Sequence, residues 1–185
     1  YFDAKQGLAT GDNDRFLRFW HEVGHQKIDF QQTQYDAFTS DKKWFPYSKG
    51  GPARKWYGNH ELIVDWENNG ENLKEYKDSQ GKRLSTLKNL TYMFSEAITW
   101  SLTSIAGILC VRWRQCGFVF DTNGMSAFPK KGLTTVFGVA LLNSKVSQEV
   151  LKLLNPTMAF QSGDIDRVPV PKDFEALQEM HSGKI

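Results

Sequence analysis

The sequence has few cysteines and no long apolar run, and both absences narrow the class of protein. No stretch of about 18 apolar residues occurs that could span a bilayer, so we expect no membrane partner. Only two of the 185 residues are cysteine, Cys110 and Cys116, and no C-x-x-C pair occurs, which favours a reducing compartment. The N-terminal stretch has neither a signal peptide nor a starting methionine. We therefore expect a cytoplasmic piece of a longer chain.

Most catalytic signatures are also missing. The chain has no G-x-S-x-G, no P-loop and no G-x-G-x-x-G after a strand, and its cysteines and histidines stand in no known catalytic arrangement. The sequence therefore predicts no catalytic residue and no cofactor for this chain.

One stretch, HEVGH at 21–25, matches the H-E-x-x-H pattern, in which two histidines on a helix bind zinc and the glutamate acts as general base. Apolar residues there recur at i, i+3, i+4 and i+7, which predicts a short amphipathic helix: Phe16, Phe19, Trp20 and Val23. Both histidines would lie on its solvent face. The extended motif needs glycine at 28 and histidine at 31, where Ile28 and Gln31 stand. A zinc hydrolase is therefore a remote alternative, and we expect no metal ligand.

The residue pattern predicts an α+β fold with strand-rich regions and a long helix near the C-terminus. Three runs are rich in β-branched and aromatic residues, as strands are: 60–66, 97–113 and 118–121. Two stretches have a helical pattern: 71–76 and 134–156. The expected apolar face of the second helix is Val139, Leu142, Val146, Val150 and Leu153.

Charge is unevenly distributed although the net charge is only +2. The first basic segment, 42–60, carries five basic residues, five aromatic residues and no acid, whereas the following segment 61–78 is acidic. The second basic segment, 112–131, has Asp121 as its only acid. Cations with aromatic residues between them suit a nucleic-acid backbone and its bases. The glycines and proline of 49–58 predict a mobile basic turn that could hold phosphate.

The residues expected to bind DNA come from these two segments and include Tyr57 and the asparagines beside the basic residues. They are Lys42, Lys43, Lys49, Arg54, Lys55, Tyr57, Asn59, Arg112, Arg114, Asn123, Lys130 and Lys131. We expect at least one of Arg112, Arg114 and Asn123 to contact a base edge and the lysines to contact phosphates. In the alternative interpretation the two arginines pair with the acidic segment, and the basic loop is ordinary surface whose aromatic residues are core anchors: Trp44, Phe45, Trp56 and Tyr57.

Five blocks of the sequence, in this order, resemble a known domain. They are GLATGDNDRFLRFW, KWFPYSKGGPARKWYGNHELIVDWENNGENLK, ITWS, GFVFDTNGMSAFP and ALLNSKVSQEVLKLLNPTMAFQSGDIDRVPVP. The pattern resembles the target-recognition domain that follows the catalytic domain in TaqI-like adenine-specific DNA methyltransferases, and most of all those of BREX phage-defence systems. The specificity subunits of type I restriction systems share the LLNS-type helix and the run reaching PVP. The resemblance covers about 7–171.

The resemblance implies a module that recognises double-stranded DNA within a larger N6-adenine methyltransferase. In such enzymes a catalytic domain binds S-adenosylmethionine and flips adenine into an N-P-P-Y pocket, and neither a cofactor motif nor N-P-P-Y occurs here. We therefore expect the recognition domain at 1–171, an extension or linker at 172–185, and the catalytic domain of the same parent chain as a partner. Further partners would be other defence-complex proteins or acidic DNA mimics. The alternative is a structural or protein-interaction domain whose basic loops contact an acidic partner.

Overall fold

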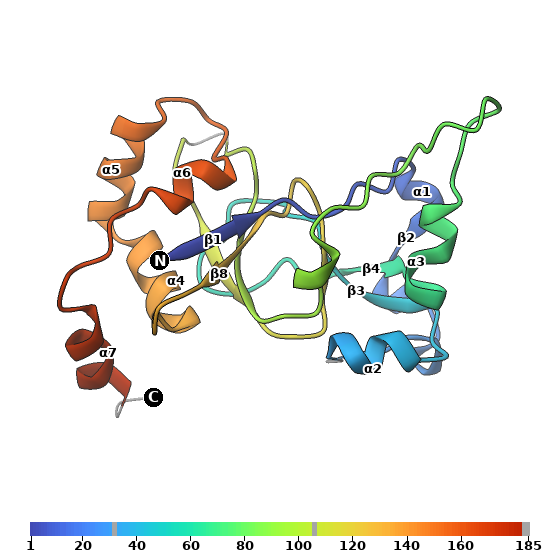
Figure 1. The fold of residues 1–185 in the computed structure, drawn as a ribbon, viewed down its shortest axis with the longest axis horizontal. Coiled ribbons are helices and arrows are strands. Elements are labelled where there is room, and N and C mark those ends of the chain that lie inside the picture. The colour runs from blue at the N-terminus through green and yellow to red at the C-terminus, as the bar shows by residue number, and fades with distance from the viewer. Residues whose placement is uncertain (31–32, 105–106, 183–185) are drawn as a thin grey trace.

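The computed structural model describes residues 1–30, 33–104 and 107–182 and has the expected α+β architecture (Figure 1). Two four-stranded sheets form its centre. Helices α1 to α3 lie at one end of the long axis with the second sheet, and α4 to α7 lie at the other end, on the side of the first sheet.

The first sheet is antiparallel throughout, and its strands come from both halves of the chain. Its order is β1 (Phe2–Lys5), β8 (Ser126–Pro129), β5 (Ala97–Trp100) and β6 (Val111–Arg114). The expected strand run 97–113 is therefore two strands, β5 and β6, which pair with Ala97 opposite Arg114. Residues 105–106 of that run lie outside the described residues.

Four C-terminal helices lie near the first sheet. They are α4 (Thr135–Asn143), α5 (Lys145–Leu154), α6 (Ser162–Asp166) and α7 (Phe174–Ser182). Apolar side chains of the sheet and helices form a buried core, to which Trp100, Leu142, Leu151 and Phe174 contribute. Because Phe174 is buried there, α7 packs on the domain. The division at 171 stays a prediction.

The second sheet holds the N-terminal part of the candidate site. Its order is β2 (Leu17–Phe19), β4 (Leu62–Asp65), β3 (Trp44–Ser48) and β7 (Val119–Phe120), with only β3 and β7 parallel. The surrounding helices are α1 (Asn13–Phe16), α2 (Gln34–Thr39) and α3 (Glu67–Lys74). Short 3-10 helices occupy Trp20–Glu22, His25–Lys27 and Leu90–Tyr92. Phe45, Phe120 and Phe128 from the two sheets, together with Phe94 from the turn before β5, contribute to a second core.

The prediction of one amphipathic helix through HEVGH is wrong. Helix α1 ends at Phe16, and the next three residues form strand β2, where Leu17 pairs with Val64. Sheet pairing therefore replaces the helical period. His21 and His25 belong to two separate 3-10 helices, so they do not share one α-helical face.

The prediction of one long C-terminal helix is also wrong. Ser144 has an extended backbone and its side chain accepts a hydrogen bond from the Ser147 N–H, so it caps a new helix, α5. The break changes the direction of the side chains that follow. Val146 and Leu153 are 71% and 87% exposed and do not line the core as expected.

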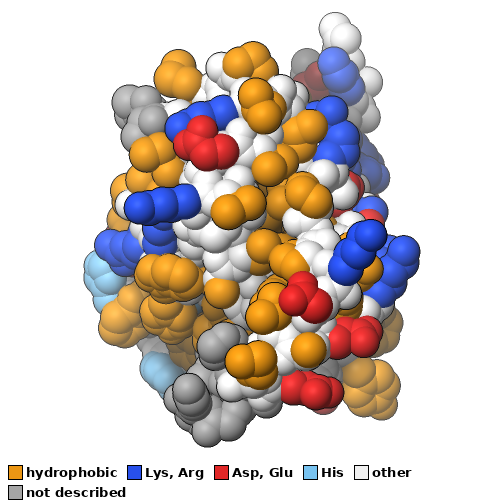
Figure 2. Space-filling view, turned by 90° about the vertical axis from the view of Figure 1, so that its left-hand side faces the viewer, with side chains coloured by type: hydrophobic (Ala, Val, Ile, Leu, Met, Phe, Trp, Pro, Cys, Tyr) orange, Lys and Arg blue, Asp and Glu red, His pale blue; other side chains and the backbone are white. Residues whose placement is uncertain are grey.

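Exposed apolar side chains are common on the side of the molecule formed by the C-terminal helices. Figure 2 faces this side and shows hydrophobic side chains over much of it, with basic side chains between them. Val136, Val146 and Leu153 are exposed members of α4 and α5. Among the described residues, no helix has both the length and the apolar character needed to cross a bilayer.

Candidate nucleic-acid interface

The basic loop, which we define as 49–59, is attached to the first sheet. The Trp56 N–H donates to the Val111 carbonyl at 3.0 Å, and the Trp113 N–H donates to the Trp56 carbonyl at 2.8 Å. Trp56 thus forms an isolated parallel bridge beside β6. These bonds tie the middle of the loop, which the sequence predicted to be a mobile turn, to strand β6.

Glycines let the start of the basic loop approach a second turn closely. Gly50 and Gly51 have φ of +99° and +108°, and a Cβ on Gly50 would lie 2.9 Å from the Asn123 carbonyl oxygen. A Cβ on Gly124 would lie 2.3 Å from the Ser48 carbonyl oxygen. Side chains at these positions would separate the two turns. The structure therefore brings residues 49–51 of the first basic segment together with the turn 121–124 of the second.

The aromatic residues of the first basic segment divide into two groups. Trp44 and Phe45 belong to strand β3 and are buried, as the core-anchor interpretation predicted. Trp56 and Tyr57 are 57% and 56% exposed at the middle of the basic loop. Trp56 also has a positive φ of 75°, a conformation rarely adopted by bulky residues. The structure therefore presents Trp56 and Tyr57 at the surface in a fixed conformation.

Arg112 and Arg114 are buried, contrary to the expectation that they stand beside surface turns. Their exposed fractions are 1% and 0%. Both lie in β6, two residues apart, and therefore project to the same face of the sheet. Arg112 donates to the Arg54 carbonyl at 3.3 Å, and Arg114 donates to the Ser126 hydroxyl at 2.7 Å. In this conformation neither guanidinium is available to a DNA base, and neither makes a hydrogen bond to the acidic segment.

Burial lowers the pKa values of three basic side chains near the basic loop. Desolvation lowers the pKa of Arg114 to about 9 and that of Arg112 to about 10. Desolvation, with the nearby charges of Arg112 and Arg114, lowers the pKa of His60 to about 4. His60 is therefore neutral at pH 7, because its proton would add a third positive charge to a partly buried site.

The remaining predicted residues do not form one surface. Lys49 follows the last residue of β3 and Lys43 precedes its first, so the length of the five-residue strand separates them, roughly 15–20 Å. Lys43 forms ion pairs with Asp65 and Glu67, and Lys42 pairs with Asp41.

The predicted residues after β8 are also far from the basic loop along the strand. Lys130 and Lys131 follow β8, whereas Asn123 precedes it. Lys130 pairs with Asp3 at 2.7 Å, and the Lys131 ammonium lies over the Tyr1 ring.

Within the basic loop, the residues predicted to bind DNA differ in their exposure to solvent. Arg54 and Tyr57 are exposed, whereas Lys55 reaches the carbonyl of Asn143 at 3.4 Å. Asn59 is buried and donates to the Pro52 carbonyl at 3.0 Å. The structure therefore leaves Arg54, Tyr57 and Asn123 exposed and Lys49 half-buried, and it makes Asn59 a support of the loop.

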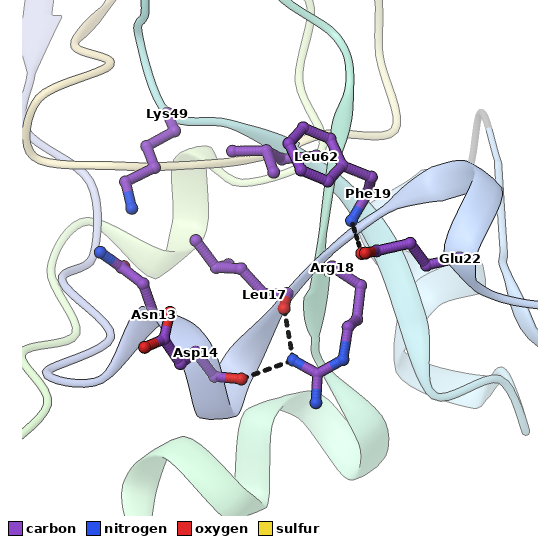
Figure 3. A pocket seen from close by; sticks show the side chains of 8 residues that line it. All are labelled: Asn13, Asp14, Leu17, Arg18, Phe19, Glu22, Lys49 and Leu62. Carbon is purple, nitrogen blue, oxygen red and sulfur yellow. Dashed lines mark hydrogen bonds between the residues drawn. The ribbon is translucent and has the colours of Figure 1, made fainter.

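A hollow of about 400 Å³ lies between the start of the basic loop and the N-terminal segment (Figure 3). Lys49 and Arg18 line it together with two acids, Asp14 and Glu22. The guanidinium of Arg18 donates to the carbonyls of Asp14 and Leu17. The sequence analysis missed Arg18 as a site residue because its position depends on the pairing of β2 with β4, which brings it opposite Ile63.

The HEVGH stretch provides no metal site in the described part of the chain. No group of three or more histidine, cysteine, aspartate or glutamate side chains is placed there to hold a metal ion. Glu22 instead accepts the Phe19 N–H at 2.7 Å. The α-helix on which the zinc motif depends is absent.

Comparison with known proteins identifies two similar methyltransferases, although no family model matches the chain. The chain is 42% identical over 170 residues to the adenine-specific methyltransferase PglX of Lacticaseibacillus casei (strain Zhang), covering 91% of this chain and 14% of that protein. It is 36% identical over 173 residues to the adenine-specific methyltransferase BrxX of Escherichia coli O9:H4 (strain HS), covering 92% of this chain and 13% of that protein. This chain is thus similar, over about nine tenths of its length, to one short segment of much longer adenine-specific methyltransferases.

Proposed function

We propose that this chain is the double-stranded-DNA recognition module of a larger N6-adenine DNA methyltransferase. The observation that carries the proposal is the fixed basic loop, which presents Arg54, Trp56 and Tyr57 at the surface while Lys49 and Asn123 lie at its start. A rigid sheet that holds an exposed loop with cations and aromatic groups is a common arrangement for binding residues. The similarity to PglX and BrxX supports the same function.

Each group in this surface has a separate expected role. Arg54 and Lys49 would contact phosphates, which fix the position of the module without reading sequence. Asn123 is exposed, and an asparagine amide can bond adenine N6 and N7 in the major groove. Arg112 would hold the loop through the Arg54 carbonyl, and both Arg112 and Arg114 would add positive potential near it.

The parent enzyme would supply the chemistry. Its catalytic domain would bind S-adenosylmethionine and the flipped adenine, while this module would select the site. The resemblance to BREX methyltransferases supports a role for that activity in bacterial phage defence, where methylation would mark host DNA. Acidic DNA-mimic proteins would compete for the same surface because they present a similar charge.

Salt-dependent binding tests the proposal. With the full-length protein, we would measure duplex affinity at several salt concentrations for the wild type and for Arg54→Ala with Lys49→Ala. Two lost phosphate contacts should reduce the slope of log K against log salt by about 1.8. The matched control is Lys82→Ala with Arg83→Ala, two exposed basic residues of the hairpin 77–83. A slope unchanged by the first pair, or lowered equally by both, would refute this placement of the interface.

A second candidate function is contact with another part of the same parent protein. The exposed Val146 and Leu153 of α5 favour it, since exposed apolar patches mark interaction surfaces. The chain spans only 13–14% of the two relatives' lengths, so most of a parent of that size lies outside it. This contact would use the C-terminal helices, and the basic loop would remain free for DNA.

A further inference from the structure

A small pocket with aromatic walls lies beside the basic loop. Its volume is about 150 Å³, and its lining includes Trp20, Phe30, Tyr57, His60, Gln115 and Phe118. Typical sites for drug-sized ligands are about 300–1,000 Å³. The pocket therefore has room for one small ring system and not for a larger ligand.

Ring contacts and a backbone hydrogen bond hold the walls of this aromatic pocket. The Tyr57 ring meets His60 edge-on with centroids 4.8 Å apart, and His60 meets Phe118 at 4.8 Å. Tyr57 also stacks on Trp113 at 6.2 Å. The backbone N–H of Trp20 donates to the Glu61 carbonyl at 3.0 Å, and this bond holds the start of the 3-10 helix that carries the Trp20 side chain. A ligand would thus meet a preformed site.

The charges around the aromatic pocket are mainly positive. Arg54, Arg112 and Arg114 act electrostatically on His60, and Glu61 is the acid that acts on it with the opposite sign. Arg54 and Glu61 are 3.9 Å apart and both are exposed, so this pair is weakly held. The surroundings therefore favour a flat group that brings a negative charge to the pocket mouth.

Several buried polar atoms near the aromatic pocket lack a hydrogen-bond partner within the described residues. They are His60 Nε2, Arg112 Nε, Arg112 Nη2 and Arg114 Nε. Buried polar groups are nearly always satisfied. Of these residues only His60 lines the pocket, so the wall of the pocket contains an imidazole nitrogen without a hydrogen-bond partner in the described residues.

We propose that the aromatic pocket takes one unstacked nucleobase of the bound DNA, with the adjoining phosphate near Arg54. This inference rests on the proposed DNA-recognition function and adds a base other than the adenine that would enter the catalytic domain. Aromatic rings stack on any base, and the neutral His60 and the Gln115 amide offer hydrogen-bonding groups to its edge. The positive surroundings favour a nucleotide over the aromatic side chain of a protein partner.

The test uses the full-length protein and two duplexes that differ by a single unpaired nucleotide. The wild type should bind the duplex with the unpaired nucleotide about ten-fold more tightly, because its base is already unstacked. Trp20→Ala should remove most of this preference and leave the salt dependence of duplex binding unchanged, and Tyr57→Ala should likewise remove most of the preference. Both residues are at least half exposed, so the variants should fold. Tyr35→Ala is the control, since Tyr35 lies on α2, is 76% exposed and does not line the pocket.

The outcomes separate this inference from the function on which it rests. Salt-dependent duplex binding without any preference for the unpaired nucleotide would overturn the pocket proposal and leave the DNA-recognition function standing. Absence of binding to both duplexes would overturn both. Competition by N-acetyl-tryptophanamide together with no preference for the unpaired nucleotide would assign the pocket to a protein side chain, and so overturn the proposal.

Discussion

Acid should destabilise the fold through His60, and replacing this residue should remove that effect. The pKa of His60 falls from 6.5 in the unfolded chain to about 4 in the folded protein, because of desolvation and the charges of Arg112 and Arg114. Between these pH values the unfolded chain binds a proton that the folded protein does not. Stability is therefore complete above about pH 6.5 and decreases as the pH falls toward 4. The full difference corresponds to about 3 kcal/mol, and partial exposure of the ring reduces our expectation to about 2 kcal/mol.

Urea unfolding at pH 7 and at pH 4.5 measures this effect. For His60→Phe, which keeps a ring between Tyr57 and Phe118, the loss of unfolding free energy between the two pH values should be smaller than in the wild type by about 2 kcal/mol. Carboxylates also titrate in this range, but they are the same in both proteins and cancel in the difference. His25→Ala is the control because His25 is exposed on a 3-10 helix. An equal pH dependence in His60→Phe and the wild type would refute the assignment of a lowered pKa to this histidine.

The structure supports four further predictions. Arg114→Met should have an unfolding free energy within about 2 kcal/mol of the wild type, because removing an uncompensated buried charge offsets the lost hydrogen bonds. A loss of about 3–5 kcal/mol, measured by urea unfolding, would instead indicate that the guanidinium charge is compensated in the folded protein. Val146→Ser and Leu153→Ser should each change the stability of this chain by less than about 0.5 kcal/mol. Each should lower the stability of the full-length protein by more than that, as thermal unfolding of this chain and of the full-length protein would show. Gly124→Ala should cost at least about 2 kcal/mol in urea unfolding and weaken duplex binding, since its Cβ would lie 2.3 Å from a backbone carbonyl oxygen of β3. Asn123→Ala should relax the preference at one position of the methylated site, by about 1–3 kcal/mol in sequencing of modified sites; discrimination that is undiminished at every position would exclude base contact by this residue.

The strands could be predicted from the sequence where β-branched and aromatic residues are concentrated. The runs 60–66, 97–113 and 118–121 contain β4, β5 with β6, and β7 respectively, since these residue types suit a pleated, buried surface. The mixed fold class follows from these strands and the helical stretches. The order of strands within the two sheets could not be predicted, because β1 pairs with β8 across more than 120 residues and no local pattern encodes that pairing.

Helix prediction failed where a local polar group or a distant strand outweighed the apolar period. At 134–156 the hydroxyl of Ser144 offers a cap to α5, so the chain breaks into two helices although the apolar spacing continues. At 16–23 the period of Phe16 and Phe19 agrees with a helix, but β4 provides backbone partners for Leu17 and its neighbours. Neither competing interaction can be read from periodicity alone.

The two segments that form the candidate site could be predicted from the sequence, but the burial of their individual residues could not. Because side chains alternate along a strand, Arg112 and Arg114 were expected on the same face of it. That this face is buried depends on the position of the second sheet, which the local sequence does not show. Exposed Trp56 reverses the usual preference of tryptophan for burial, and its position follows from two backbone hydrogen bonds to the β6 region. Long-range packing therefore decided which basic and aromatic residues reach the surface.

The burial of Arg112 changes the role that this residue can have in recognition. Its guanidinium donates to the Arg54 carbonyl, and the neighbouring Val111 and Trp113 hold both backbone groups of Trp56. Strand β6 thus sets the position of the whole basic loop. A residue that contacts a base edge affects one position of a DNA site, whereas a residue that positions a loop affects every contact the loop makes. Because Arg112 supports the carbonyl of Arg54, its influence on DNA binding should be spread over all sequences, and base selection should belong to exposed groups such as Asn123.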